Sequence, residues 1–414
     1  RKPRDMAQLI CDHLPSTTDI IKTEIAGPGF INFFFSPSTN LAIISSILQA
    51  GERYGTSTAG QGQRVQIEFV SANPTGPLHV GHGRGAAYGA SLANLLKAAG
   101  FSVQREYYVN DAGRQMHILA TSIWLRYLQS GGISLEFPAS GYQGDYVGTI
   151  AADLRHTYGD SLQYDALAVM TDIPTDGRQG GNRENHIDAL IDRAQQLLGE
   201  KRYHILFNSG LNAMRVDIEN DLEEFGVKYD CWFSERSLAD QGAIMHVIHK
   251  LRDNGHIYEQ GGALWFRATD FGDDKDRVVQ RDNGRITYFA ADIAYHLNKF
   301  ERGFSQVINV WGADHHGYVT RVKAALQALG INPDQLTVKL VQFAILYRGQ
   351  QRLKMSTRSG SFVTLRQLRD EVGTDAARFY YVTRKIEQHM DFDLELAKSD
   401  SKDNPVYYIQ YAHT

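Results

Sequence analysis

The chain has 414 residues, a formal net charge of −4, 43% hydrophobic residues and 22% charged residues. This length is enough for two or three domains with a substantial buried core. No stretch approaches the roughly 20 apolar residues that span a bilayer, so we expect a globular protein without a membrane role. The small negative charge gives no general attraction to nucleic acids, so any RNA contact must use local basic patches.

The cysteine content excludes a disulfide framework and a cysteine-based zinc cluster, because only Cys11 and Cys231 are present. We expect no metal site in the protein and a location in a reducing cytoplasm. The chain starts without Met or an apolar signal core and ends inside a helical pattern at residues 407–411. We therefore expect a fragment that is truncated at both ends.

A β-α-β unit is predicted near the start of the chain, after a strand at Phe30–Phe35 and a helix from Leu41 to Gly51. Its first strand is Val65–Val70, whose alternation puts Glu68 on the face opposite to the apolar residues. A small-residue helix at Gly83–Ala99 and a strand at residues 103–109 complete the unit. Right-handed crossover then predicts a parallel sheet.

The rest of the chain is expected to complete an α/β fold. Residues 131–200 lack strand patterning, which indicates an insertion between two half-sheets. Further elements are expected in chain order: sheet elements at Ala263–Phe266, around Tyr288 and at Val307–Trp311, a helix at Tyr318–Leu329, and a strand at Val338–Tyr347 that leads to Lys354.

Two short motifs point to nucleotide chemistry. His79 and His82 lie three residues apart at a strand-to-helix turn that is rich in glycine. Glycines let a base or phosphate approach the backbone, and a helix N-terminus offers unpaired N–H groups to an anion. A metal pair or two ordinary surface histidines is the alternative, and neither a dinucleotide fingerprint nor a P-loop is present.

The second motif is the segment Gln350–Gly360, which concentrates cations, hydroxyls and glycine after a predicted strand. Such a loop could close over the outer phosphates of ATP and stabilise the departing pyrophosphate. Alone, a charged run is more often a solvated turn. Separated from the double histidine by a full α/β domain, it favours an ATP site.

These motifs resemble signatures of bacterial arginyl-tRNA synthetases. The segment Glu68–His82 resembles the first signature, and Lys354–Thr357 resembles the second, although Thr357 stands where the family usually has another lysine. The similarity extends to Tyr107–Gly113, Trp311–Gly317 and Asp403–His413. The resemblance implies a class I, Rossmann-like parallel-sheet catalytic domain with an insertion, flanked by remnants of an N-terminal α+β domain and an all-helical anticodon-binding domain.

The resemblance also implies a division of the chain. The segments are the end of a tRNA-contacting domain (1–38), the first half of the catalytic domain (39–130), the insertion (131–205), the second catalytic half (206–345), the signature loop with a stem-contact region (346–395), and the start of the anticodon-binding domain (396–414).

The implied activity is that of an arginine–tRNA ligase. Such an enzyme activates L-arginine with ATP to give arginyl-adenylate and pyrophosphate, and then transfers arginine to the 3′ end of tRNA(Arg). The resemblance implies ATP and Mg²⁺, L-arginine and tRNA(Arg) as partners, and a cytoplasmic monomer. The catalytic residues would be His79, His82, Lys354 and Ser356. ATP would contact His79, Gly81, His82, Gly83, Gly312, Asp314, Lys354, Met355 and Ser356. Arginine would contact Glu68, Asn73, His79, Tyr288, Asp292 and His315.

An arginine pocket needs carboxylates, because an unpaired buried guanidinium is very costly. Glu68 lies at the start of the segment that resembles the first signature, and Tyr288 and Asp292 share a face if their segment is helical. The ordinary alternative is a sheet-edge acid and a surface pair. Other class I synthetases, for lysine, glutamine or cysteine, a tRNA-independent nucleotidylyltransferase and a non-catalytic RNA-binding paralogue are the competing functions.

Overall fold

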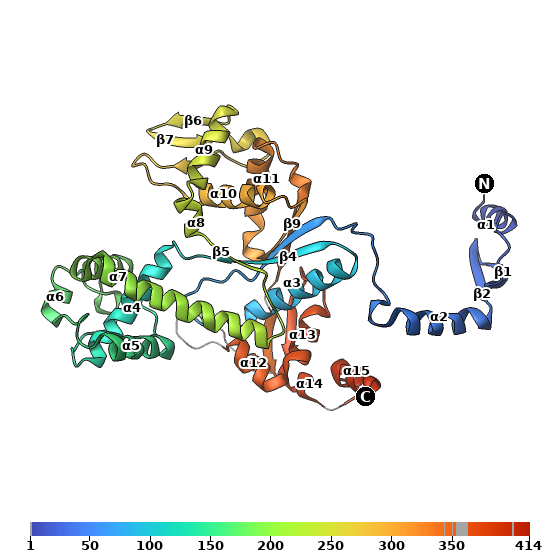
Figure 1. Cartoon of the computed structure of the whole chain (residues 1–414), viewed down its shortest axis with the longest axis horizontal. Helices are drawn as coiled ribbons and strands as arrows, with labels where there is room; N and C mark the ends of the chain where they lie inside the picture. The colour runs from blue at the N-terminus through green and yellow to red at the C-terminus, as the bar shows by residue number, and fades with distance from the viewer. Residues whose placement is uncertain (1, 343, 350, 353–362, 400) are drawn as a thin grey trace. The chain divides into compact units, whose positions relative to one another are not determined.

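The computed structural model describes residues 2–342, 344–349, 351–352, 363–399 and 401–414, which fall into two compact units (Figure 1). The first unit comprises residues 1–59 and 98–100. It contains helix α1 (Pro3–Asp12), the antiparallel strands β1 (Ile20–Ala26) and β2 (Phe30–Phe35), and helix α2 (Pro37–Ala50). The strand and the helix predicted here are confirmed, and Gly51 ends α2 with a φ of +53°.

The second unit, residues 60–97 and 101–414, is built around a five-stranded parallel sheet. Its strands are β3 (Arg64–Phe69), β4 (Ser102–Val109), β5 (Cys231–Ser234), β9 (Gln306–Gly312) and β10 (Leu336–Val341). Their order across the sheet is β10-β9-β3-β4-β5, so β3 is central and the winding reverses between β3 and β9. The predicted parallel α/β fold is confirmed. In such sheets, ligands bind beyond the carboxyl ends of the strands at the point of reversal.

Strand β3 is followed by helix α3 (Val80–Ala98), as predicted, and the two elements touch closely. Residues 65–69 of β3 are all buried, because helices cover both faces of the sheet. A Cβ atom at Gly89 of α3 would lie 2.3 Å from Cγ of Phe69. Glycine at this position therefore sets how closely α3 packs on β3.

The connection from β4 to β5 is a helical insertion with its own hydrophobic core. It contains α4 (Arg114–Ser130), α5 (Asp145–Tyr158), α6 (Ala166–Met170) and the long α7 (Arg183–Glu224), which kinks at Gly199. In Figure 1, the first three helices gather around the start of α7, which then runs back toward the sheet. Ile218 and Leu222 near the end of α7 join the core of the sheet.

The connection from β5 to β9 corrects two expectations. It holds α8 (Arg236–Asp240), α9 (Ala243–Asp253), a separate antiparallel sheet of β6 (Ile257–Gln260), β7 (Ala263–Phe266) and β8 (Arg277–Gln280), and α10 (Tyr288–Glu301). The strand predicted at residues 263–266 exists but lies outside the parallel sheet. The segment at Tyr288 is a helix, because the Thr287 side chain caps its first turn by accepting from the Ala290 N–H group.

Helix α11 (His316–Ala328) follows β9, as predicted, but the long strand expected at residues 338–347 is wrong. Strand β10 ends at Val341, and β11 (Ala344–Arg348) joins β12 (Gln351–Arg352) and β13 (Met390–Asp393) in another sheet. The chain is held at this break by buried Arg84, which donates to the carbonyl oxygens of Gln342, Lys385 and Gln388 at 2.7–2.9 Å. The remaining helices are α12 (Leu365–Val372), α13 (Thr374–Val382), α14 (Leu394–Lys398) and α15 (Pro405–His413).

The contact between Gly89 and Phe69 predicts opposite effects for two matched substitutions in α3. Gly89→Ala should lower the free energy of unfolding by about 1–3 kcal/mol, because the added methyl group overpacks the core. Gly85→Ala, where no atom lies within 4 Å of the new Cβ, should raise it by about 0.5–1 kcal/mol through helix propensity. Urea unfolding of both variants measures the difference, and equal changes would show that Phe69 moves aside.

Candidate active site

The double-histidine turn is attached to the chain that returns after the second signature. The Val80 N–H group donates to the Val363 carbonyl oxygen at 3.2 Å, and the Leu365 N–H group donates to the Leu78 carbonyl oxygen at 2.9 Å. His79 and Thr364 form a β-bridge between these bonds. The start of α3 is therefore fixed against residues 363–365.

The two histidine rings are stacked, with centroids 3.7 Å apart. Nδ1 of His82 accepts from the backbone N–H group of His79 at 3.2 Å, and Nδ1 of His79 accepts from that of Gly81 at 3.1 Å. Because Nδ1 is an acceptor in each ring, each neutral imidazole carries its hydrogen on Nε2.

Burial keeps both rings neutral. It lowers the pKa of His79, and it lowers the pKa of His82 to about 3, with a smaller contribution from the neighbouring His79. Each ring therefore carries a single hydrogen, on Nε2, at neutral pH. An anion against the pair would be bound by hydrogen bonding, without full positive charges.

The histidines line a cavity of about 230 Å³, here called the histidine cavity. The turn at residues 72–77 and two tyrosines of the insertion, Tyr142 and Tyr146, form its other walls. The Tyr146 hydroxyl group donates to the carbonyl oxygen of Thr75 at 2.6 Å. The insertion is thus bonded directly to the turn of the first signature.

A second cavity of about 440 Å³, here called the acid cavity, opens where the winding of the sheet reverses. Its walls come from the ends of β3, β4 and β9 and from helices α10 and α11. The lining residues are Glu68, Val70, Ser71, Asn73, Tyr108, Asn110, Tyr288, Asp292, Tyr295, His296, Val310, Trp311, Gly312, His315 and Tyr318. Asn73 lines both cavities, so they adjoin at this residue.

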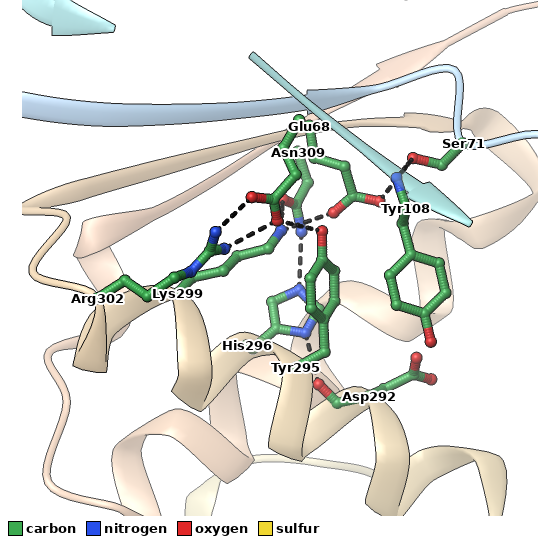
Figure 2. Close-up of polar contacts among 10 residues, drawn as sticks. Glu68, Ser71, Tyr108, Asp292, Tyr295, His296, Lys299, Arg302 and Asn309 are labelled. Carbon is green, nitrogen blue, oxygen red and sulfur yellow. Dashed lines mark hydrogen bonds and ion pairs between the residues drawn. The ribbon is translucent and has the colours of Figure 1, made fainter. Parts of the chain in front are cut away.

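Glu68 on the cavity wall is held from two sides (Figure 2). Its Oε2 atom accepts from the ammonium group of Lys299 at 2.6 Å, and its Oε1 atom accepts from the Ser71 hydroxyl group at 3.0 Å. The Ser71 hydroxyl oxygen accepts in turn from the Tyr108 N–H group at 3.1 Å. Glu68 is therefore buried and oriented, which excludes the alternative of an exposed sheet-edge acid.

Asp292 has a different environment. Its Oδ2 atom accepts a hydrogen bond from the Tyr318 hydroxyl group, and Figure 2 shows the Tyr108 hydroxyl group directed toward its carboxylate. Burial raises the pKa of Asp292 to about 6. Glu235, just after β5, also has its pKa raised to about 7, first by burial and then by Asp292.

The backbone turn that follows Glu68 and β3 is strained. Val70 and Ser71 have φ angles of +69° and +42°, although neither residue is glycine. Positive φ is rare for a β-branched residue, and such strain persists where surrounding contacts enforce it, often at active sites. Here the strained turn brings the Ser71 hydroxyl group within hydrogen-bond distance of the Glu68 carboxylate and leads the chain to Asn73.

Most of the predicted arginine contacts are brought together. Five of them line the acid cavity: Glu68, Asn73, Tyr288, Asp292 and His315. His79 lines the adjoining histidine cavity. Tyr288 is 67% exposed, so it stands at the rim.

The predicted ATP contacts are less concentrated. Gly312 lines the acid cavity, and Asp314 follows it in an exposed turn beside His315. Gly83 faces protein, because a Cβ atom there would lie 2.8 Å from both Leu365 and Tyr381. The predicted contacts Lys354, Met355 and Ser356, like Thr357, lie outside the described residues.

Sequence reasoning missed Tyr108, Glu235, Lys299 and Tyr318. The local signal for Tyr108 and Glu235 is their place at or just after the end of a strand of the parallel sheet, where ligand-contacting residues are expected. Tyr108 also lies in the segment Tyr107–Gly113 that resembles the family. Among the described residues, no group of three His, Cys, Asp or Glu side chains is arranged to hold a metal ion. In the same residues, no helix has the length and hydropathy that a membrane crossing requires.

Comparison with known families agrees with this geometry. The family described as "tRNA synthetases class I (R), catalytic domain" matches residues 43–148 and 187–392. The family described as "Arginyl tRNA synthetase N terminal domain" matches residues 1–35. Together with the reversed parallel sheet and the double-histidine turn, these matches define a class I aminoacyl-tRNA synthetase.

Individual relatives show which family of class I synthetases the chain resembles. The arginine–tRNA ligase of Thioalkalivibrio sulfidiphilus is 63% identical, over 100% of this chain and 70% of the relative. That of Hydrogenovibrio crunogenus is 59% identical, over 100% and 71%. The chain belongs to the arginyl-tRNA synthetases, and its activity is that of an arginine–tRNA ligase, acting on arginine and tRNA with ATP as a substrate. The lysine-type and nucleotidylyltransferase alternatives are set aside.

Solved structures show the same fold. A Campylobacter jejuni chain described as a candidate arginyl-tRNA synthetase has a TM-score of 0.75 and 35% identity, over 92% of this chain and 76% of that one. The Thermus thermophilus arginyl-tRNA synthetase has a TM-score of 0.68 and 20% identity, over 100% and 72%. The second likeness concerns the fold alone.

The neutral histidine pair predicts a loss that does not depend on pH. If His82 stabilises the charge that develops on the phosphoryl oxygens, His82→Ala should slow adenylate formation by at least about 10²-fold. Since the pKa of His82 is about 3, the factor should be the same at pH 6 and pH 8. Single-turnover kinetics measure it, with the exposed His246→Ala as control. An equal loss of arginine affinity would contradict the role.

Proposed function

We propose that the acid cavity binds the arginine side chain and that the histidine pair contacts the α-phosphate of ATP. The observation that carries this assignment is the position of Glu68 and Asp292 in one cavity, which adjoins the histidine cavity at Asn73. A substrate whose side chain is bound in the acid cavity would extend its carboxylate toward the histidine cavity. This is the arrangement that carboxylate activation by ATP requires.

Recognition of the guanidinium group would use Glu68 and Asp292 as planar acceptors, with Tyr288 closing the rim. Charge-assisted bonds to a forked cation are strong and directional. A neutral side chain of similar size would leave these buried acceptors unpaired, so rejection by about 10⁴-fold or more needs no editing domain. Asn73 would bind the α-amino group, and His315, which lines the same cavity, would also contact arginine.

Two reactions follow from this placement. In the first, an arginine carboxylate oxygen attacks the α-phosphorus atom, a P–O bond forms, and pyrophosphate leaves. The attacking group is already ionised, so no protein base is required, and the Nε2–H donors of His79 and His82 stabilise charge on the phosphoryl oxygens. In the second, a ribose hydroxyl group of tRNA attacks the arginyl carbonyl carbon, and AMP leaves with the bonding electrons.

The outer phosphates are assigned to the second signature by resemblance. Lys354 and Ser356 would hold them, with Met355 beside them. Gly81, Gly312 and Asp314 keep their proposed ATP contacts, whereas Gly83 is not proposed as one, because Leu365 and Tyr381 lie against it. Mg²⁺ would be held by the phosphate oxygens of ATP, because this ion is commonly bound through substrate phosphates with few protein ligands.

The wider assignments are proposals as well. Residues 1–38 and 396–414 would belong to tRNA-contacting domains, 39–130 and 206–345 to the catalytic halves, 131–205 to the insertion, and 346–395 to the signature loop and stem contact. A cytoplasmic monomer that takes tRNA(Arg) as its cognate tRNA is proposed on the same resemblance.

The direct test is amino-acid-dependent exchange of labelled pyrophosphate into ATP by the full-length protein, with and without tRNA(Arg). We expect exchange with arginine and none with lysine or glutamine. Exchange with lysine but not with arginine would overturn the assignment of the acid cavity.

The raised pKa of Asp292 predicts how arginine binding depends on pH. The guanidinium group pairs with the ionised carboxylate, and the pKa of Asp292 is about 6. Apparent arginine affinity should therefore be constant above about pH 7 and fall up to about tenfold for each pH unit below 6. Asp292→Asn should raise the KM for arginine about 10- to 100-fold and leave the KM for ATP unchanged. A matching rise in the KM for ATP would place Asp292 elsewhere.

A further inference from the structure

Lys299 is a fully buried cation behind the wall of the acid cavity. It projects from α10, two turns after Asp292, and reaches Glu68 on β3 at 2.6 Å. Its ammonium group also donates to Oδ1 of Asn309 on β9 at 2.9 Å and lies 4.2 Å from the centroid of the Tyr295 ring. The ammonium group thus makes two hydrogen bonds and one cation–π contact.

The bonds continue from Lys299 to the backbone of Asp292. Because Oδ1 of Asn309 accepts from Lys299, its Nδ2 group donates to Nε2 of His296 at 2.8 Å. Nδ1 of His296 therefore carries the hydrogen and donates to the carbonyl oxygen of Asp292 at 2.7 Å. Burial lowers the pKa of His296 to about 3, which keeps this tautomer neutral. Figure 2 shows the connected chain from Glu68 to α10.

The two acids of the cavity differ in their counter-charge. Glu68 has Lys299, whereas no lysine or arginine among the described residues forms an ion pair with Asp292 within 4.0 Å. The titratable or charged groups that face Asp292 come from five elements or their ends: Glu68, Tyr108, Glu235, Lys299, Tyr318 and Arg321.

We propose that Lys299 is a positioning residue for arginine recognition, which fixes the carboxylate of Glu68 and, through Asn309 and His296, its spacing from Asp292. The proposal rests on the assignment of the acid cavity to arginine. Lys299 has no place on the cavity lining, so it acts through Glu68. The pocket then presents two acids to the single positive charge of the substrate: Glu68, which is paired with Lys299, and Asp292, which has no such ion pair among the described residues.

A neighbouring ion pair provides the comparison that separates this role from stability alone. Glu106 on β4 is also fully buried and is paired at 2.6 Å with Arg302, the residue that caps the C-terminus of α10 and whose side chain is 27% exposed. Neither Glu106 nor Arg302 lines the acid cavity. Both cations thus come from the C-terminal end of α10, but only Lys299 bonds directly to an acid of the cavity wall. The Arg302 pair reaches the wall only through the Tyr295 hydroxyl group, which donates to Glu106 at 2.8 Å.

The test compares Lys299→Met with Arg302→Met in the full-length enzyme, with steady-state kinetics of tRNA arginylation from pH 5.5 to 8.5. In Lys299→Met, the KM for arginine at pH 7 should rise about tenfold, because a buried charge loses its partner, and the KM for ATP should stay within twofold. The pH midpoint of arginine binding should also move upward, because Lys299 is one of the groups that lower the pKa of Asp292. Arg302→Met should change neither quantity.

An arginine KM and a pH midpoint equal to those of the wild type in Lys299→Met would overturn the proposal, provided that Asp292→Asn is impaired. If Asp292→Asn also binds arginine normally, the assignment of the cavity fails instead. If Lys299→Met does not fold, Asn309→Leu tests the proposal instead. This variant breaks the series of hydrogen bonds from Lys299 to the backbone of Asp292 but keeps the cation. We expect about a threefold higher arginine KM with an unchanged pH midpoint, and an unchanged KM would overturn the proposal.

Discussion

A carboxylate on the central strand of a buried sheet is the constraint on which the substrate site depends. Glu68 lies on β3, whose two faces are covered, so its charge requires an internal cation and fixed donors. Lys299 meets the first need, and Ser71 meets the second by way of a strained turn. The same turn leads to Asn73, where the two cavities adjoin. In the proposed assignment, the positions of the arginine side chain and of its reacting carboxylate therefore both follow from how the protein accommodates Glu68.

The chemistry of the histidine pair also depends on what burial removes. Stacked imidazoles that each accept a backbone N–H bond on Nδ1 are left as neutral donors. Neutral donors impose less desolvation cost than cations in a partly buried turn, and they stabilise a phosphoryl oxygen most when its charge grows. The pair thus suits a step in which the nucleophile arrives already ionised and no proton needs to move.

The local part of this site could be predicted from the sequence, and the long-range part could not. Strand β3, the signature turn and α3 follow from alternation, glycine content and a helical pattern in one continuous segment. Tyr288 was expected in a sheet because a short aromatic run does not distinguish a strand from the first turn of a helix. Lys299 is separated from Glu68 by 231 residues. A pattern in the α10 segment alone gives no reason to pair this lysine with an acid on β3.

The hydrogen bond from Tyr146 to Thr75 has a mechanical consequence for the enzyme. The Tyr146 side chain connects the helical insertion to the backbone of Thr75, two residues beyond Asn73. Because the helices of the insertion share one core, a small rotation of the insertion would displace the turn through this hydrogen bond. A macromolecule that rests on those helices would therefore act on the position of Asn73, the residue proposed to bind the amino group of arginine, without touching the amino acid itself.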